Sequence, residues 1–133
     1  MHLFSENIKV GQEYVGGTLN NSATTAAYFS MANYDKIAFI IYTGALTSTA
    51  SLSIQGWQRV GASGAEAVLG SAVTYATATG LKTVEYSAAD MTVSSGYDRI
   101  GLVITETGTQ NAVIKSVVAL QYRARYGQAT LPS

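Results

Sequence analysis

The sequence predicts an all-β fold, a single β-sandwich of about eight antiparallel strands arranged as a jelly roll. Short segments rich in β-branched and aromatic residues alternate with patches of Ser, Thr, Ala and Gly, as expected of strands bounded by turns. No segment of ten or more residues carries apolar positions at helical spacing. A chain of 133 residues forms one domain with one core, so residues 1–133 are treated as a single unit. Strand count alone does not separate a jelly roll from an immunoglobulin-like order.

Eight segments are predicted as strands. The first alternates in residue type and fits either a strand or part of an N-terminal arm over residues 1–15. The third is apolar from Ile37 to Tyr42, which predicts burial on both faces. The fourth buries either Leu52 with Ile54 or Trp57, with a bulge at Gly56. In chain order the segments are Ile8–Val15, Thr24–Met31, Lys36–Thr43, Ser51–Val60, Val68–Ala76, Leu81–Ala88, Tyr97–Glu106 and Ala112–Tyr122.

The links between these segments predict turns. Thr77–Gly80 and Thr107–Asn111 have the lengths of hairpin connections. Gly16-Gly17 and Gly61–Gly64 lack the Lys-Ser/Thr of a phosphate loop and are interpreted as β-turns. Ser87, with Asp90 three residues later, predicts one capped helical turn. Residues 123–133 are expected to form an irregular C-terminal arm.

The composition is poor in charge. Charged residues make up 12% of the chain, against roughly 25% in an average domain. A surface built instead from Ser, Thr, Ala, Gly and nine Tyr is weakly protected against association, which predicts protein partners. The net charge is zero, which argues against nucleic acid binding. No apolar run suggests a membrane span or a secretory signal, so synthesis in the cytoplasm is expected.

The residues that catalysis requires are scarce. The only histidine, His2, lies near the N-terminus, where a Ser-His-Asp arrangement is improbable. The eight acidic residues are scattered singly and the chain has no cysteine, so no metal site and no cofactor is expected. Asp35 and Asp98 both follow Tyr just before a strand and are interpreted as turn formers, although a glycosidase pair stays open. A small β-sandwich enzyme is therefore the weakest hypothesis.

Aromatic residues offer an alternative. Trp57, together with Tyr28, Tyr42 or Tyr75, has the chemistry of a stacking platform for a sugar. This predicts, as the second hypothesis, a carbohydrate-binding or receptor-binding β-sandwich domain. A lone Trp in a β-sandwich is more often core or interface, because an aromatic ring supplies the largest burial per residue.

Three stretches carry a resemblance to a known family. They are Ser30–Gly44, Glu85–Ile100 around Tyr86-Ser87-Ala88-Ala89-Asp90-Met91, and Leu120–Gly127. This layout resembles the capsid cement or decoration proteins of tailed bacteriophages, in particular the jelly-roll cement proteins of the Bordetella phage type. The resemblance implies a non-enzymatic subunit on the outside of the virion capsid, whose partners are the major capsid protein and a second copy of itself.

Both ends of the chain are expected to contact the capsid. Segments that order on binding reach across a seam that a compact sandwich does not span. The C-terminal contacts include the residue types common among binding hot spots. The predicted interface residues are Phe4, Ile8, Tyr14, Arg123, Arg125 and Tyr126.

Overall fold

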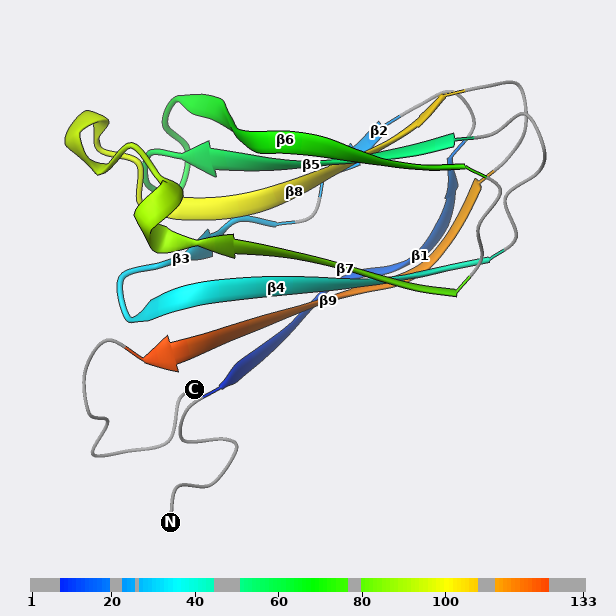
Figure 1. Ribbon diagram of the computed structural model, residues 1–133, viewed down its shortest axis with the longest axis horizontal. Helices are drawn as coiled ribbons and strands as arrows, with labels where there is room; N and C mark the ends of the chain where they lie inside the picture. Colours follow the sequence, from blue (N-terminus) through cyan, green and yellow to red (C-terminus); the bar gives the residue numbers. More distant parts are fainter. Residues whose placement is uncertain are drawn as a thin grey trace, which may run out of the picture.

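Two antiparallel sheets face each other in a computed structural model that describes residues 8–19, 23–25, 27–44, 51–76, 80–107 and 112–124 (Figure 1). One sheet has the order β1-β9-β4-β7 and the other β2-β8-β5-β6, with β3 also paired to β8. The strands are β1 (Lys9–Leu19), β2 (Ala23–Thr25), β3 (Phe29–Ser30), β4 (Tyr34–Thr43), β5 (Ser51–Arg59), β6 (Glu66–Ala76), β7 (Gly80–Ser87), β8 (Arg99–Thr107) and β9 (Ala112–Ala124).

The strand order is that of a jelly roll. The first strand lies beside the last, and the chain passes repeatedly from one sheet to the other. This confirms the predicted fold class, with one modification. The predicted strand Thr24–Met31 is divided into β2 and β3, which pair with different parts of β8.

Two predicted hairpins are wrong. Strands β6 and β7 lie in different sheets, and so do β8 and β9, so the links after Ala76 and Thr107 cross between the layers. Packed sheets lie about 10 Å apart, a distance that four or five extended residues cover. Link length therefore does not distinguish a hairpin from a crossover.

The hairpin seen among the described strands joins β5 to β6. Its turn is closed by the Val60 amide, which donates to the Ala65 carbonyl at 2.9 Å, and Gly61 adopts a φ of 59°. The turn predicted at Gly61–Gly64 is confirmed. The turn predicted at Gly16-Gly17 is wrong, because both glycines lie within β1, where pairing with β9 holds the chain extended.

The core lies between the sheets. Strand β5 alternates regularly and turns Leu52 and Ile54 inward with no exposed surface, so Trp57 faces outward. The pairing of β5 with β6 shifts register between Ile54 and Gly56, but the extra residues lie on β6, between Val73 and Leu69, while β5 stays in register with β8. The bulge predicted at Gly56 is therefore wrong. The centre is filled by Phe39, whose ring meets Phe29 of β3 and Tyr86 of β7 edge-on, with centroids at 6.0 and 6.3 Å.

Gly56 is required by close packing across the core. A Cβ atom at this position would lie 2.5 Å from the Tyr86 ring. We expect Gly56→Ala to lower the free energy of unfolding by about 3 kcal/mol, the upper end of the cost of overpacking. Gly61→Ala is the control, because its Cβ would have nothing within 4 Å and would cost about 1 kcal/mol through its positive φ alone. Urea unfolding followed by circular dichroism measures both, and equal losses would contradict the packing argument.

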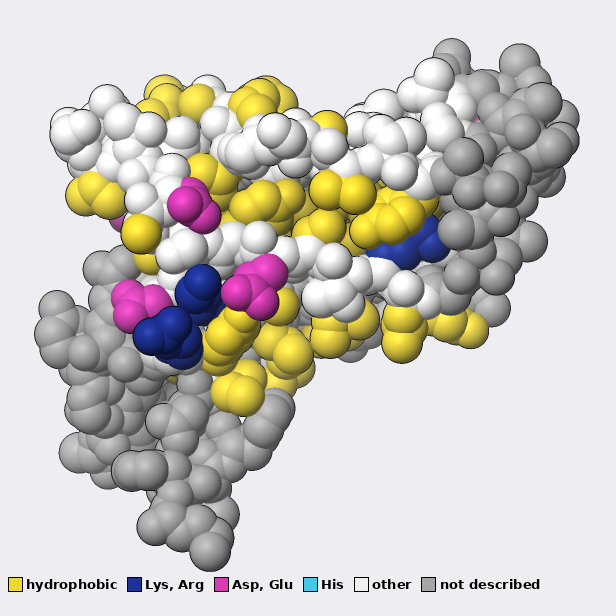
Figure 2. All heavy atoms as spheres, in the orientation of Figure 1, with side chains coloured by type: hydrophobic (Ala, Val, Ile, Leu, Met, Phe, Trp, Pro, Cys, Tyr) yellow, Lys and Arg dark blue, Asp and Glu magenta, His cyan; other side chains and the backbone are white. Residues whose placement is uncertain are grey.

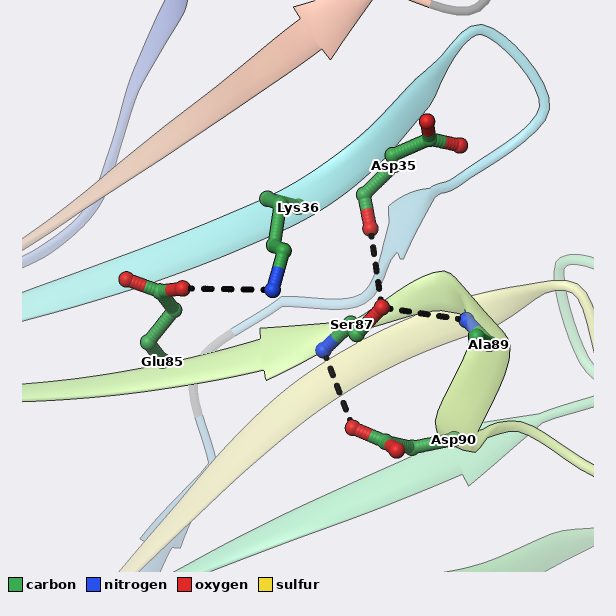
Figure 3. A network of polar contacts seen from close by, with 6 residues as sticks. All are labelled: Asp35, Lys36, Glu85, Ser87, Ala89 and Asp90. Carbon is green, nitrogen blue, oxygen red and sulfur yellow. Dashed lines mark hydrogen bonds and ion pairs between the residues drawn. The ribbon is translucent and has the colours of Figure 1, made fainter.

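A short 3₁₀ turn, η1 (Ala88–Asp90), follows β7 and has the predicted cap (Figure 3). The Ala89 amide donates to the Ser87 hydroxyl at 3.3 Å, and the Ser87 amide donates to the Asp90 carboxylate at 3.2 Å. The Ser87 hydroxyl also donates to the Asp35 carbonyl of β4 at 3.5 Å. The capping box therefore ties the turn to the central strand of its sheet. A second 3₁₀ turn, η2 (Val93–Ser95), leads toward β8.

Strands β1 and β9 include residues that the sequence analysis had placed in the N- and C-terminal arms. Residues 9–15 belong to β1, so the strand interpretation of this segment is correct and the arm interpretation is not. Strand β9 continues to Ala124 and includes Arg123, which had been assigned to the C-terminal arm. Gln121 is buried, and its side-chain amide donates to the Ser30 carbonyl at 2.7 Å. The fold therefore depends on the chain at least as far as Gln121.

Candidate functional site

The outer face of the four-stranded sheet carries a continuous set of apolar side chains. The register places Val10, Leu120 and Ala38 in one row across β1, β9 and β4. The next row holds Val118 and Ile40, and a third pairs Tyr42 with Leu81. We call this set the apolar sheet face, defined by Val10, Ala38, Ile40, Tyr42, Leu81, Val118 and Leu120.

No second layer of described residues covers this face. Leu81 is 70% exposed, Val10 56% and Tyr42 40%, while Ile40, Val118 and Leu120 are partly exposed. Hydrophobic side chains gather along the lower margin of Figure 2, where Figure 1 draws β4 and β9. The predicted burial of β4 on both faces is therefore wrong for Ile40 and Tyr42, because only the inward face is packed against the second sheet.

One end of the apolar sheet face is polar. The Lys36 ammonium lies 3.6 Å from the Glu85 carboxylate across β4 and β7 (Figure 3). Tyr122 pairs with Lys36 in the register and forms a hydrogen bond with Glu85. Lys36, Glu85 and Tyr122 are partly or fully exposed. An apolar centre bordered by paired charges is the usual anatomy of a protein interface.

The Tyr122 phenol provides a spectroscopic test of this polar end. Partial burial and the hydrogen bond to Glu85 raise its pKa from 10.0 to about 12. A raised pKa favours the protonated phenol in the folded state, so this contribution to stability is present below pH 10 and is lost as the pH rises toward 12. In an alkaline ultraviolet titration, Tyr122→Phe is expected to remove one phenol that ionises near pH 12. Glu85→Gln should move that ionisation toward pH 10, and an unchanged curve would contradict the assignment.

The predicted interface residues are distributed over both ends of the chain. Ile8 lies partly buried just before β1, Tyr14 is paired with Val117 in β1, and Arg123 is exposed near the end of β9. Phe4, Arg125 and Tyr126 lie outside the described residues. Since Lys9 pairs with Gln121, β1 begins and β9 ends at the same end of the sheet (Figure 1). The chain therefore enters β1 and leaves β9 at the same end of the sheet.

The described residues do not assemble a catalytic or metal centre. No group of three His, Asp or Glu side chains within them is placed to hold a metal ion. Asp35 belongs to β4, while Asp98 precedes β8 in the other sheet and its carboxylate accepts the Gly61 amide at 2.8 Å. Asp98 therefore acts as a turn residue at the β5–β6 hairpin. His2 lies outside the described residues, and no helix among them is long and apolar enough to cross a membrane.

The candidate aromatic residues are separated by the fold. Trp57 projects from β5 onto the outer face of the five-stranded sheet, and Tyr28 covers its neighbour Gly101 on the same face. Tyr42 belongs to the opposite outer face. Tyr75 packs partly buried against the core, with the Lys82 ammonium 4.9 Å from its ring centroid. Only Tyr28 and Trp57 therefore share a surface.

Two charged residues complete that surface. The Arg59 guanidinium lies 4.0 Å from the Tyr28 ring centroid, and its Nη1 atom is 3.7 Å from Glu66 Oε1. The Tyr28 hydroxyl forms a hydrogen bond with Glu66, and burial together with this carboxylate raises the pKa of Tyr28. We call Tyr28, Trp57, Arg59 and Glu66 the aromatic platform. Sequence reasoning missed Arg59 and Glu66. The pairing of β5 with β6 brings the two together, and only the pairing of β8 with both β5 and β3 brings them to Tyr28.

Comparison with known proteins places the chain by fold alone. No family model and no curated protein sequence matches it. The crystal structure of the SPBc2 prophage-derived protein YomS superposes with a TM-score of 0.57 and 12% identity, over 88% of this chain and 94% of YomS. The PBSX exported protein XepA gives 0.58 and 9%, over 94% of this chain and 40% of XepA. A chain of the T13 IBDV viral particle gives 0.51 and 6%, over 90% of this chain and 32% of that one.

Proposed function

We propose that this chain is a structural protein of a phage virion, a cement or decoration subunit that binds the outside of the mature head and stabilises contacts between capsomers. The apolar sheet face is the observation that carries the proposal. It presents exposed Leu81, Val10 and Tyr42 on a chain of which only 12% is charged. Solved structures of the same fold come from a prophage-derived protein and from a viral particle, which supports this class of function.

The major capsid protein is the proposed occupant of the apolar sheet face. Burial of apolar side chains supplies most of the free energy of protein association. The Lys36, Glu85 and Tyr122 cluster at one end of the face has the exposure and polarity of an interface rim. Rim charges of this kind set the orientation of a complex more than its affinity.

The two terminal segments are proposed to contact neighbouring capsid subunits. The chain enters β1 and leaves β9 at the same end of the four-stranded sheet, because Lys9 pairs with Gln121. Arg123 stands at the base of the C-terminal segment with a φ of 56°, a conformation that costs an arginine about 1–2 kcal/mol. Such a backbone position often marks a functional constraint. The predicted contacts Phe4, Ile8, Arg125 and Tyr126 belong to these segments or adjoin them.

The proposed mechanism is linkage. A subunit that binds the expanded shell and not its precursor stabilises the expanded form by about 2.7 kcal/mol per site when its free concentration is 100 times its Kd. Repetition over the lattice multiplies this modest energy. No covalent chemistry is needed.

A second copy of the chain is the other proposed partner, as the family resemblance implies. Strand β6 is an edge strand whose only charged residue is Glu66, and residues 70–74 along it are exposed. Uncharged edge strands are poorly protected against pairing with another chain. Sedimentation velocity of the free protein distinguishes a dimer from a monomer.

The test uses heads purified from a phage whose gene for this chain has been deleted. Purified protein added back is expected to bind expanded heads saturably, to bind precursor heads more weakly, and to raise the temperature at which heads release DNA. Occupancy is read from gels of gradient-purified particles. Absence of binding to expanded heads would contradict the proposed function.

Removal of residues 125–133 tests the C-terminal segment. The cut follows Ala124, so β9 and the hydrogen bond from Gln121 to Ser30 are retained. We expect the truncated protein to unfold like the full chain and to occupy heads less completely at the same concentration. Full occupancy would remove this segment from the proposed contact.

A further inference from the structure

The outer face of the five-stranded sheet carries an ordered row of side chains. Binding to the shell through the opposite face would not involve them. Trp57 of β5 is directly paired with Gly101 of β8. Tyr28 stands immediately before Phe29, which pairs with Ile100, so the row across the sheet runs from Tyr28 over Gly101 to Trp57. Two aromatic side chains therefore flank one glycine on a single outer face.

Gly101 allows Tyr28 to lie against the sheet. A Cβ atom at position 101 would be 2.7 Å from Cδ1 of the Tyr28 ring and 2.9 Å from Cε1 and Cγ. The neighbouring residues Ile100 and Leu102 are wholly buried on the inward side. Glycine within a strand commonly marks a close approach of another group. Here that group is the aromatic ring of Tyr28.

Arg59 and Glu66 fix the other side of Tyr28. The Arg59 guanidinium is 4.0 Å from the ring centroid, within the range of a cation–π contact. Glu66 accepts from the Tyr28 hydroxyl and lies 3.7 Å from Arg59. The Glu66 side chain is nevertheless 47% exposed and that of Arg59 is 21% exposed. The pair thus orients Tyr28 and still offers acceptors and donors to solvent.

Trp57 has a hydrogen-bond donor, its indole N–H, that the fold does not use. Its side chain is partly exposed, and its indole N–H has no acceptor among the residues that the structure describes. Packing of Tyr28 over Gly101 explains why these two residues occur together, but it does not explain a partly exposed tryptophan beside them. A partly exposed ring with an open donor is typical of a recognition surface.

We infer that the aromatic platform binds an oligosaccharide, with a pyranose ring stacked on the exposed part of Trp57 and its hydroxyls turned toward Arg59 and Glu66. The electron-rich faces of aromatic rings attract the C–H groups that line one face of a pyranose. The planar guanidinium of Arg59 and the carboxylate of Glu66 are suited to adjacent sugar hydroxyls, as donors and acceptors respectively. Because Arg59 already lies over the Tyr28 ring, Tyr28 positions this pair and does not itself stack on the sugar.

This inference does not rest on the proposed function, because the platform and the apolar sheet face occupy opposite sides of the sandwich. If the proposed function and this inference are both correct, the two faces have complementary roles. A subunit attached to the head through the four-stranded sheet directs the five-stranded sheet away from the shell. The platform would then face the polysaccharide of a bacterial surface or its surroundings.

Trp57 also provides the assay, since it is the single tryptophan of the chain. An immobilised array of neutral and acidic oligosaccharides identifies binders, and titration of the free chain with each binder follows the fluorescence of Trp57. We expect at least one oligosaccharide to bind with a sub-millimolar to millimolar Kd and to change this fluorescence. Absence of any binder, or binders that all leave the fluorescence unchanged, would overturn the inference.

Three variants locate the site. Trp57→Ala is expected to weaken binding to the array about tenfold or more, the loss of roughly 1.4 kcal/mol of stacking. Tyr28→Ala removes the ring on which Arg59 and Glu66 are held, and it should weaken binding through the loss of their positions. Gly101→Ala keeps every platform side chain but places a Cβ against Tyr28, and it should weaken binding as well. Val93→Ala, an exposed residue of η2, should leave the affinity unchanged. Circular dichroism checks that each variant is folded. Retained affinity in folded Trp57→Ala and Tyr28→Ala would overturn the inference.

Discussion

Replacing Phe39 with alanine is expected to lower the free energy of unfolding by about 3–5 kcal/mol, the largest loss expected from any single core substitution in this chain. Phe39 has no exposed surface and occupies the central strand β4, which pairs with β7 on one side and β9 on the other. Its ring contacts Phe29 of the opposite sheet and Tyr86 of its own. The substitution therefore removes apolar burial and two aromatic contacts at once.

Ile40→Ala is the matched control for Phe39→Ala. The two residues are adjacent in β4, but Ile40 faces outward on the apolar sheet face. Its truncation is expected to cost about 1 kcal/mol, because the side chain is only partly buried in the free protein. Urea unfolding measured by circular dichroism compares the two. A loss for Ile40→Ala as large as that for Phe39→Ala would mean that the outer face is covered in the free protein.

The positions of the strands could be predicted from local pattern. The alternation of buried and exposed residues in β5, and the turn residues Gly61 and Ser87, depend on neighbours in sequence. Each of the eight predicted segments therefore corresponds to a strand or to a pair of short strands. The capping box at Ser87 could be predicted in the same way, because Ser87 and Asp90 lie three residues apart in the sequence.

The assignment of strands to sheets could not be predicted. The link after Ala76 is equally suited to a hairpin and to a crossover, and only the packing of both sheets decides between them. The outward orientation of Tyr42 could not be predicted for the same reason. Its segment is apolar on both sides, and sequence does not reveal whether a second layer covers the outer side.

The aromatic platform shows what residue type predicts and what only the assignment of strands to sheets reveals. Tyr28 and Trp57 were candidates from residue type, but Tyr42 and Tyr75 were equally good candidates until the sheets separated them. The signal that would have singled out Tyr28 is Gly101, a glycine within an otherwise apolar strand. That Tyr28 is the residue opposite Gly101 is known only once β3 is placed beside β8.

Two aspartates on the apolar sheet face are expected to weaken binding to expanded heads by at least about 100-fold. Val10 lies on edge strand β1 and Leu81 on edge strand β7, so Val10→Asp with Leu81→Asp places a charge at each side of the face. An unpaired carboxylate that is buried in an interface costs several kcal/mol, and 1.4 kcal/mol corresponds to a factor of ten. Both side chains are more than half exposed in the free protein, so its fold should tolerate the change.

Val68→Asp is the matched control for these substitutions. Val68 is 51% exposed and lies on edge strand β6 of the other sheet, close to Val10 in exposure and in its position at an edge. The Val68 side chain lies on the outer face with Trp57, whereas a second copy would pair with the backbone of β6. The same charge there should therefore leave head occupancy unchanged, because the five-stranded sheet is proposed to face away from the shell. Particle gels at a series of protein concentrations give both affinities. If Val68→Asp abolished binding and the double variant retained it, the opposite face of the sandwich would be the one that meets the shell.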